Sequence, residues 1–318
     1  MKSIEEANVK KGMRVLIRVD WNMPTDEAGT ILDASRIEVS LPTIEYVKNK
    51  EGIPIIASHF GREEDSMEPV IDFAKKNYKV LAEGVEFLEN LRKNSGEENN
   101  NENFARELTN KADIYVNEAF SVSHREHASI VKAPEFLPHF AGFRFLEEYK
   151  RLSEAFNPEH PFLLVLGGVK FETKLPLVEK FLEVADYIFI GGALAVKASE
   201  MSIANNSKII FPIGDYAALD ANAETLEILA EKIKEAKFVL WNGPLGDYEK
   251  GFVAGTVALS RMLAESNAKI ILGGGDTLVL LKPEIKKQIS PHGFISTAGG
   301  AMLEFLANGT LPGIEALK

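Results

Sequence analysis

The feature that most constrains the fold is a repeated alternation between short apolar runs and amphipathic segments. The runs are rich in β-branched residues, and each ends in a loop. They span residues 15–20, 53–61, 85–92, 112–120, 162–168, 187–192, 237–243, 269–275 and 293–300. Segments with apolar residues near helical spacing lie between many of them, for example residues 174–185 and 223–236. This alternation predicts an α/β protein whose parallel sheets are covered by helices on both faces.

The chain of 318 residues is long enough for two domains, each with its own core. Near its middle, residues 145–156 have a helical pattern, residues 157–161 (NPEHP) are typical of a turn, and a new buried strand follows. We therefore predict that the two domains connect here. Residues 94–103 (NSGEENNNEN) are predicted to form a polar loop with no core-forming residues.

Composition excludes several classes of function. The chain has no cysteine, which excludes disulfides, zinc–thiolate sites and thiol catalysis and fits a reducing compartment. Its formal net charge of −11 argues against a nucleic-acid partner. The N-terminus lacks the apolar region of a signal peptide, and the apolar runs are shorter than the roughly 20 residues that span a bilayer. We therefore expect a cytoplasmic protein with no membrane partner.

Basic side chains gather at the ends of the predicted strands in the first half of the chain. Ligands of open α/β sheets bind beyond the carboxyl ends of the strands. The polar residues expected at this edge are Asp20, Asn22, Arg36, His59, Arg62, Arg92, His124, Arg125 and His127. Arginine binds phosphate and carboxylate through a planar fork of donors, so the set predicts a pocket for a small anion. The alternative for any single arginine is a surface position or a structural ion pair, and neither His59 nor His127 is assigned as a general base.

Glycine clusters end the predicted strands in the second half, at residues 167–168, 191–192, 242–246, 273–275 and 299–300. Glycine lets the backbone approach a ligand closely, and a following helix offers free N–H groups to phosphate oxygens. Lys170 and Lys174 are candidates for neutralising a transferred phosphoryl group, and Asp276 for holding Mg²⁺ on a polyphosphate. A single cluster of this kind is equally typical of a tight strand-to-helix turn. Five at successive strand ends favour a phosphate site.

The common nucleotide motifs are missing from the sequence. No Gly-Lys dipeptide occurs, so there is no Walker A loop. The segment GGGDTL has Leu278 where a Rossmann dinucleotide fingerprint requires its last glycine. No HRD or DFG triplet supports a protein kinase.

A series of ten segments nevertheless resembles, in order, the signature blocks of the phosphoglycerate kinase family. They are RVDWNMP, SHFGR, ENLR, NEAFSVSHREHAS, LGGVKFETK, IGGALA, WNGPLGDYE, GGGDT, STAGGAMLE and LPGIEAL. The order and number of the blocks are specific, although no single block is. The resemblance implies two doubly wound, parallel-sheet, Rossmann-like domains joined by a helix, with an inter-domain cleft. It implies a phosphoglycerate-binding domain of residues 1–155 plus 303–318 and a nucleotide-binding domain of residues 156–302.

The resemblance also implies the ligands and the residues that bind them. The first domain would bind 3-phosphoglycerate or 1,3-bisphosphoglycerate, the second would bind ATP or ADP with Mg²⁺, and the protein would be a monomer. The residues implied for the phosphoglycerate are Asp20, Asn22, Arg36, His59, Arg62, Arg92 and Arg125. Those implied for the nucleotide are Lys170, Lys174, Asn242, Glu249, Gly274, Asp276 and Thr277. In the family pattern Glu249 would hold the ribose hydroxyls and Asp276 the metal.

Several positions depart from the family pattern. The block NEAFSVSHREHAS has Glu118 for an aspartate and Ser121 for a glycine, and STAGGAMLE has Ala298 and Met302 where the family has a glycine and a serine. The methyl group of Ala298 is expected to crowd a ligand unless its backbone is in the αR or β region. The chain is also shorter than typical members, with material missing between residues 79 and 87 and between 195 and 220. The second gap falls where the family builds part of the adenosine pocket, so base affinity should be affected more than phosphate chemistry.

The implied reaction is direct, reversible phosphoryl transfer between ATP and the carboxylate of 3-phosphoglycerate. Arg36 from one domain, with Lys170 and Lys174 from the other, would surround the moving group as catalytic residues, so domain closure by hinge bending is expected. The leading alternative is a degenerate, non-catalytic relative that binds an anionic metabolite or a protein. A nicotinamide-dependent dehydrogenase is a more remote alternative, since the Rossmann fingerprint fails.

Overall fold

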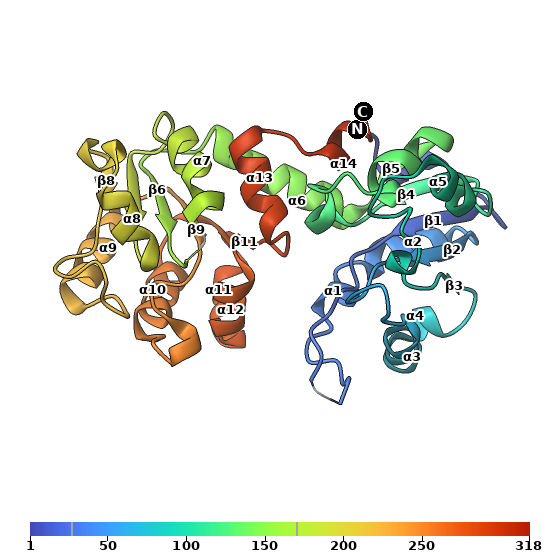
Figure 1. The fold of residues 1–318 in the computed structure, drawn as a ribbon, viewed down its shortest axis with the longest axis horizontal. Coiled ribbons are helices and arrows are strands. Elements are labelled where there is room, and N and C mark those ends of the chain that lie inside the picture. Colours follow the sequence, from blue (N-terminus) through green and yellow to red (C-terminus); the bar gives the residue numbers. More distant parts are fainter. Residues whose placement is uncertain (27, 170) are drawn as a thin grey trace. The chain divides into compact units, whose positions relative to one another are not determined.

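The computed structural model describes residues 1–26, 28–169 and 171–318, which form two compact units (Figure 1). Unit 1 comprises Met1–Tyr149 and Thr310–Lys318, and unit 2 comprises Lys150–Gly309. The change from unit 1 to unit 2 falls within helix α6 (Phe143–Ser153). The roles predicted for Lys170 lie outside the described residues.

Unit 1 is built on a five-stranded parallel sheet. Its strands, in spatial order, are β3 (Glu86–Phe87), β2 (Ile53–Ala57), β1 (Arg14–Arg18), β4 (Ile114–Asn117) and β5 (His139–Ala141). Its α-helices are α1 (Ser35–Glu38), α2 (Leu41–Asn49), α3 (Glu68–Asn77), α4 (Lys79–Ala82), α5 (Glu102–Thr109), the first part of α6, and α14 (Pro312–Glu315). Strand residues Val15, Ile17 and Val116 are fully buried with Ile44 of α2 and Val70 of α3. Each such side chain contributes about 1.5–3 kcal/mol by leaving water.

Unit 2 is built on a six-stranded parallel sheet. Its strands, in spatial order, are β11 (Gly293–Ile295), β10 (Lys269–Gly273), β9 (Phe238–Asn242), β6 (Phe162–Leu166), β7 (Tyr187–Ile190) and β8 (Ile209–Ile210). Its helices after α6 are α7 (Phe171–Phe181), α8 (Ala193–Ser199), α9 (Ala223–Glu235), α10 (Ala254–Glu265), α11 (Gly275–Leu280), α12 (Pro283–Ile289) and α13 (Gly300–Asn308). The central strand β6 is buried along its whole length, which explains its unbroken apolar sequence FLLVL.

The two-sheet, parallel α/β architecture predicted from the sequence is confirmed, and some elements differ in extent. Strands β5 and β8 were not expected. They are edge strands of three and two residues, too short to give a periodic signal. The predicted run at residues 85–92 pairs only at Glu86–Phe87. The inter-domain cleft and its closure stay predictions.

The end of the chain returns to unit 1 later than expected. Residues 303–318 were predicted to join the first domain, but only Thr310–Lys318 belong to unit 1. Helix α13 packs on α7 within unit 2, and Phe305 of α13 meets Phe156 edge-on with ring centroids 5.4 Å apart. Helix α14 then packs on the π-helix η4 (Ala128–Lys132) of unit 1.

Both sheets reverse their strand order at a central pair of strands. In unit 1 the order turns between β1 and β4, and in unit 2 between β6 and β9. At such a switch point the loops leave neighbouring strands in opposite directions and open a crevice beyond their carboxyl ends. The topology therefore places one candidate ligand site beyond β1 and β4 and another beyond β6 and β9.

Glu118 follows β4 and binds the start of helix α6. Its Oε1 accepts hydrogen bonds from Thr43 Oγ1 at 2.9 Å and from the backbone N–H of Arg144 at 3.0 Å. Its Oε2 is buried and has no hydrogen-bond partner within the described part of the chain. Burial raises the pKa of Glu118 to about 8, although these hydrogen bonds act in the opposite direction.

We expect Glu118→Gln to remove a pH dependence of stability. The folded pKa of about 8 exceeds the ordinary value of 4.5, so the folded state binds the proton more tightly. The stabilising contribution is therefore complete below the ordinary pKa and is lost as the pH rises to the folded pKa. In that window the wild-type free energy of unfolding should fall by about 1.4 kcal/mol per pH unit relative to the variant. Urea unfolding at several pH values measures this, and parallel curves for the two proteins would contradict it.

Candidate functional site

The site of unit 1 is centred on the carboxylate of Asp20, which follows β1. Asp20 is buried and forms an ion pair with the guanidinium of Arg36, from helix α1. The same oxygen accepts a hydrogen bond from Ser121 Oγ, in the turn after β4. Burial alone would raise the pKa of Asp20, but the charge of Arg36 and the other groups around it outweigh burial and lower the pKa to about 2. Asp20 is therefore an anion at neutral pH.

His59 lies beside this pair and is neutral. Its Nδ1 is 3.9 Å from Asp20 Oδ1 and 3.4 Å from a guanidinium nitrogen of Arg18. Burial and the charge of Arg18 lower the pKa of His59 to about 3. A neutral imidazole here can donate or accept a hydrogen bond to an uncharged part of a ligand, and it does not add to the positive charge of the site.

The other arginines supply the positive charge of the site. Burial, followed by the charge of Arg92, lowers the pKa of Arg125, so these guanidinium groups lie close enough to repel each other. Arg92 bonds the carbonyl of Gly61 and pairs with Glu98 at 2.9 Å. Mutual repulsion among arginines at a strand edge is relieved by an anionic ligand.

Asn22 and Arg62, which were also predicted for this site, do not hydrogen-bond to the carboxylate of Asp20 through their side chains. Asn22 uses its side-chain oxygen to accept the backbone N–H of Gly61 at 2.9 Å, so it fixes the loop after β2. Arg62 is exposed, and within the described residues its guanidinium group makes no hydrogen bond or ion pair; its backbone N–H donates to Asp65 and its carbonyl accepts from Asn90. The structure therefore brings together Asp20, Arg36 and His59 directly, while Asn22 has a supporting contact.

A buried hydrogen-bond network next to the site was not predicted from the sequence. Arg18 is 1% exposed and donates to Ser129 Oγ at 2.8 Å. Ser129 Oγ in turn donates to Glu97 Oε1 at 2.6 Å, and Glu97 is fully buried. Glu97 lies in the loop predicted to be polar and without core residues. Its composition could not reveal that the loop delivers a carboxylate to a buried arginine from a distant strand.

Unit 2 has a cavity of about 490 Å³ beyond the carboxyl ends of β6, β9, β10 and β11. Backbone at the predicted glycine clusters forms much of its wall. The lining residues from the four strand ends are Gly168, Val169, Asn242, Gly243, Gly274, Gly275, Asp276, Gly299 and Gly300, and helices α7 and α13 supply the rest. Helices α7 and α13 begin at this edge of the sheet, so their N-terminal N–H groups suit a phosphate.

Lys174 and Gly243 meet at the wall of this cavity. Lys174 is 7% exposed, and its ammonium group bonds the carbonyl of Gly167. Gly243 has φ +97°, and a Cβ there would overlap the same carbonyl and the ammonium group. Only glycine fits this turn, which keeps backbone and lysine at the cavity wall. The helical segment predicted for residues 174–185 begins earlier than expected: α7 starts at Phe171 and has Lys174 in its first turn.

Asn242 and Thr277 have different roles at this wall. Asn242 lines the cavity, and its Nδ2 is 3.9 Å from Met302 Sδ. Thr277 is fully buried, and its Oγ1 accepts the backbone N–H of Gly243 at 3.1 Å. Thr277 therefore fixes the loop at Gly243, which lines the cavity, while Gly274 provides the turn before α11 at φ +102°.

Ala298 and Met302, which depart from the family pattern, do not narrow the cavity. Ala298 is buried, has no positive φ and is not among the residues that line the cavity. Met302 is also fully buried. The expected crowding by the Ala298 methyl group does not occur, because its backbone is outside the left-handed region.

Asp276 is the candidate metal ligand of this cavity. It is exposed in the first turn of α11, and Tyr248 OH donates to its Oδ1 at 3.0 Å. The described residues contain no cluster of three or more His, Cys, Asp or Glu that would hold a metal alone. One carboxylate beside a phosphate site nevertheless fits Mg²⁺, which is commonly bound by one or two carboxylates together with substrate phosphates. Glu249 is exposed in the short helix η8 (Tyr248–Lys250) and does not line the cavity.

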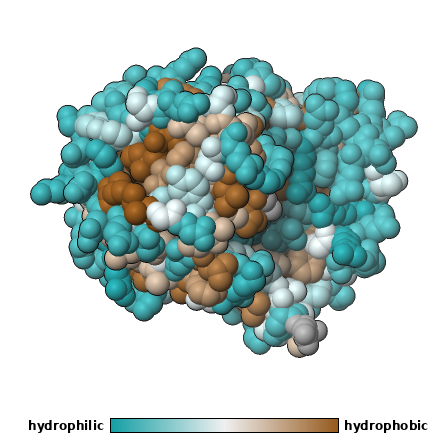
Figure 2. Space-filling model, turned by 60° about the vertical axis from the view of Figure 1, so that its left-hand side comes forward, coloured by the Kyte–Doolittle hydropathy of each residue, from teal (hydrophilic) through white to brown (hydrophobic). Residues whose placement is uncertain are grey.

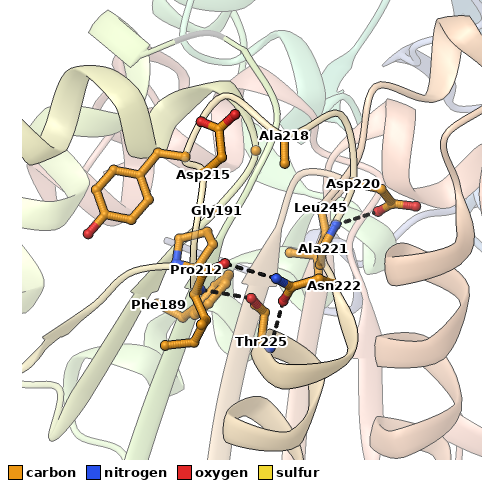
Figure 3. Close-up of a pocket in the computed structure, with 13 residues that line it drawn as sticks. Phe189, Gly191, Pro212, Asp215, Ala218, Asp220, Ala221, Asn222, Thr225 and Leu245 are labelled. Atoms are coloured by element: carbon orange, nitrogen blue, oxygen red, sulfur yellow. Dashed lines mark hydrogen bonds between the residues drawn. The ribbon is translucent and has the colours of Figure 1, made fainter.

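A second pocket of unit 2 lies beyond β7, at Gly191 and Gly192 (Figure 3). Phe189, Pro212 and Leu245 contribute apolar walls. The loop that covers it is held by Thr225 Oγ1, which accepts the N–H of Ile213 at 2.9 Å, and by Asn222 Nδ2, which donates to the carbonyl of Ile213 at 2.9 Å. The pocket has a volume of about 20 Å³, which is room for about one water molecule.

A family model described as Phosphoglycerate kinase matches residues 4–209 and 196–309, and so includes both sites. The chain belongs to the phosphoglycerate kinase family. The phosphoglycerate kinase of Finegoldia magna is 33% identical, and the alignment covers 99% of this chain and 98% of that protein. That of Wolbachia sp. subsp. Drosophila simulans is 34% identical over 96% of this chain and 95% of its own length.

Solved structures of phosphoglycerate kinases share the fold. The structure from Coxiella burnetii has a TM-score of 0.85 and 30% identity, covering 99% of this chain and 98% of that one. The structure from Pyrococcus horikoshii has a TM-score of 0.84 and 25% identity, covering 100% and 98%. The alignment to the F. magna phosphoglycerate kinase spans 394 positions, more than the 318 residues of this chain, so this family member is shortened internally.

None of the helices in the described part of the chain has the length and apolar character that a membrane span requires. The surface in Figure 2 is largely hydrophilic, with apolar residues exposed among polar ones. Large exposed apolar side chains of unit 2 are Val169, Val196, Ile213, Leu219, Phe252 and Val279.

Proposed function

We propose that the protein catalyses reversible phosphoryl transfer between ATP and the carboxylate of 3-phosphoglycerate, forming ADP and 1,3-bisphosphoglycerate. The observation that carries this proposal is that the two switch points have chemically different sites. Unit 1 has an arginine-rich site around an ionised aspartate, and unit 2 has a glycine-walled cavity with a buried lysine. A binding module for a single metabolite would need only one of these sites, so the non-catalytic alternative is not favoured.

The roles of the described residues follow from their contacts. Arg92 and Arg125 would bind the phosphate of the phosphoglycerate, where their mutual repulsion is relieved. Asp20 would accept the substrate hydroxyl, with neutral His59 beside it. Lys174, the backbone at Gly243 and the start of α13 would bind the nucleotide phosphates and stabilise charge on the transferred group. No covalent intermediate is required, because the carboxylate of the substrate is itself the nucleophile.

Asp276 and Mg²⁺ complete the nucleotide side of the proposal. Bound Mg²⁺ would neutralise charge on the β- and γ-phosphates, and Asp276 would hold it. The ribose role of Glu249, the monomeric state and the cytoplasmic location stay predictions.

A coupled assay tests the proposal. The protein would be given 3-phosphoglycerate and MgATP, and product would be followed as NADH oxidation by glyceraldehyde-3-phosphate dehydrogenase. Turnover that depends on both substrates is the expected result. Absence of turnover in a folded protein that binds both substrates would overturn it.

We expect weak discrimination between nucleoside bases. The pocket beyond β7 is the candidate base subsite, and its volume of about 20 Å³ leaves little room to bury a purine ring. Little buried base surface means little binding energy to distinguish one base from another. The kcat/KM values for MgATP and MgGTP should therefore differ by less than about tenfold, equivalent to about 1.4 kcal/mol. A preference for ATP above about 100-fold would show that the loop over the pocket opens to bind the base.

A further inference from the structure

Tyr248 contacts the carboxylate that the proposed function assigns to the metal. Its hydroxyl donates to Asp276 Oδ1 at 3.0 Å, which is good hydrogen-bond geometry. The two residues come from different strand ends, since Tyr248 begins η8 after β9 and Asp276 lies in α11 after β10. Sequence analysis did not single out Tyr248.

The loop that carries Tyr248 is held firmly in place. The backbone N–H of Asp247 bonds the carbonyl of Leu219 at 2.8 Å, and the carbonyls of Asp247 and Tyr248 accept the N–H groups of Phe252 and Gly251. Asp276, by contrast, is exposed in a helix of six residues. The only hydrogen bond of its side chain within the described residues is the one from Tyr248, which leaves Oδ2 without a protein donor there.

An exposed carboxylate with no fixed partner samples several rotamers and loses that freedom when it binds a metal. A phenol on Oδ1 restricts the side chain beforehand and leaves Oδ2 for the metal. Hydrogen bonds of this kind to ligating carboxylates typically contribute 10–100-fold to metal affinity or activity.

We propose that Tyr248 is a positioning residue that orients Asp276 for the divalent cation bound with the nucleotide. The inference rests on the proposed function, because it presupposes that Asp276 holds the cation. The simpler reading is that the hydrogen bond only ties two loops together. If Tyr248 orients Asp276 for the cation, loss of the hydroxyl should weaken nucleotide binding only when the metal is present. If the hydrogen bond only ties two loops together, any loss of affinity should be equal with the metal and without it.

The test compares the affinities of the wild-type chain and Tyr248→Phe for ADP, by calorimetry, with Mn²⁺ and without any divalent cation. We expect Tyr248→Phe to weaken Mn²⁺–ADP binding by about tenfold or more and to leave metal-free ADP binding and the Tm unchanged. Excess Mg²⁺ should restore kinase turnover in the variant. Equal losses with and without Mn²⁺, or no loss at all, would overturn the proposal.

Two further variants sharpen the result. Tyr187→Phe is the matched control, since Tyr187 is a tyrosine of unit 2 that contacts Lys232 and does not line the cavity. It should change neither affinity. Asp276→Asn tests whether Tyr248 acts through Asp276. In the Asp276→Asn protein, adding Tyr248→Phe should have no further effect on the affinity for Mn²⁺–ADP. A full additional loss of affinity would show that Tyr248 does not act through Asp276.

The experiment separates this inference from the proposed function. A wild-type chain that binds Mn²⁺–ADP tightly but shows no turnover with 3-phosphoglycerate would count against the proposed function, and the comparison with Tyr248→Phe would still decide the role of the hydroxyl. A wild-type chain that binds ADP equally with and without Mn²⁺ would overturn the metal role of Asp276 and the role of Tyr248 together.

Discussion

Replacing Lys174 with methionine is expected to lower kcat by about 100- to 1,000-fold. Among the described residues that line the cavity of unit 2, Lys174 is the only lysine or arginine. Its ammonium group is held at the glycine turn by the carbonyl of Gly167, in a position fixed before the ligand arrives. A fixed charge in a site that excludes water stabilises a phosphoryl group in transfer far more than a mobile surface charge does.

Methionine keeps most of the apolar stem of Lys174. The loss of kcat should therefore come from removal of the charge and not from a packing defect at this position. The coupled assay measures kcat, and thermal unfolding checks that the variant is folded. Lys197→Met is the matched control, because Lys197 is an exposed lysine of the same unit that pairs with Glu172 at 2.8 Å. A folded Lys174→Met protein with more than about a tenth of wild-type kcat would contradict the role proposed for this lysine.

The sequence was informative about both sites because parallel sheets collect their ligand residues at one edge. Asp20 and Arg36 are separated by fifteen residues, yet strand and helix geometry predicts that both reach the switch point of unit 1. The glycine clusters of unit 2 likewise follow successive strands and form one cavity wall. In each case the position along an element was enough to place the residue.

Contacts that depend on side-chain packing between distant segments were not predictable. Glu97 and Ser129 support Arg18 from segments that are distant from it along the chain. Glu97 lies in a loop whose polar composition suggests only solvent exposure, and Ser129 lies in the π-helix η4. Thr277 was predicted to bind the nucleotide, and the sequence did not reveal that its Oγ1 accepts the backbone N–H of Gly243, because a side chain at the start of α11 can point either into the cavity or toward the neighbouring loop. The role of Tyr248 depends on the same kind of contact between loops.

Replacing Arg36 with alanine is expected to lower kcat by about 100-fold or more while changing the affinity for MgATP by less than about threefold. The asymmetry follows from the place of Arg36. It belongs to unit 1, where it pairs with Asp20, and the proposed nucleotide residues all belong to unit 2. An interaction made only when the phosphoryl group is transferred should affect kcat and leave nucleotide binding intact.

A second consequence concerns Asp20. Arg36 is the charge that most lowers the pKa of this carboxyl, so the pKa should rise in Arg36→Ala and fall back in Arg36→Lys, which keeps the charge but not the planar fork. Calorimetry gives the affinity for MgATP, and the coupled assay gives kcat across the acidic pH range.

If Arg36 is only a structural partner of Asp20, Arg36→Lys should restore kcat together with the low pKa of Asp20. If Arg36 also binds the transferred group through its fork, Arg36→Lys should restore the low pKa and leave kcat reduced. Equal losses of kcat and of MgATP affinity in Arg36→Ala would contradict both readings.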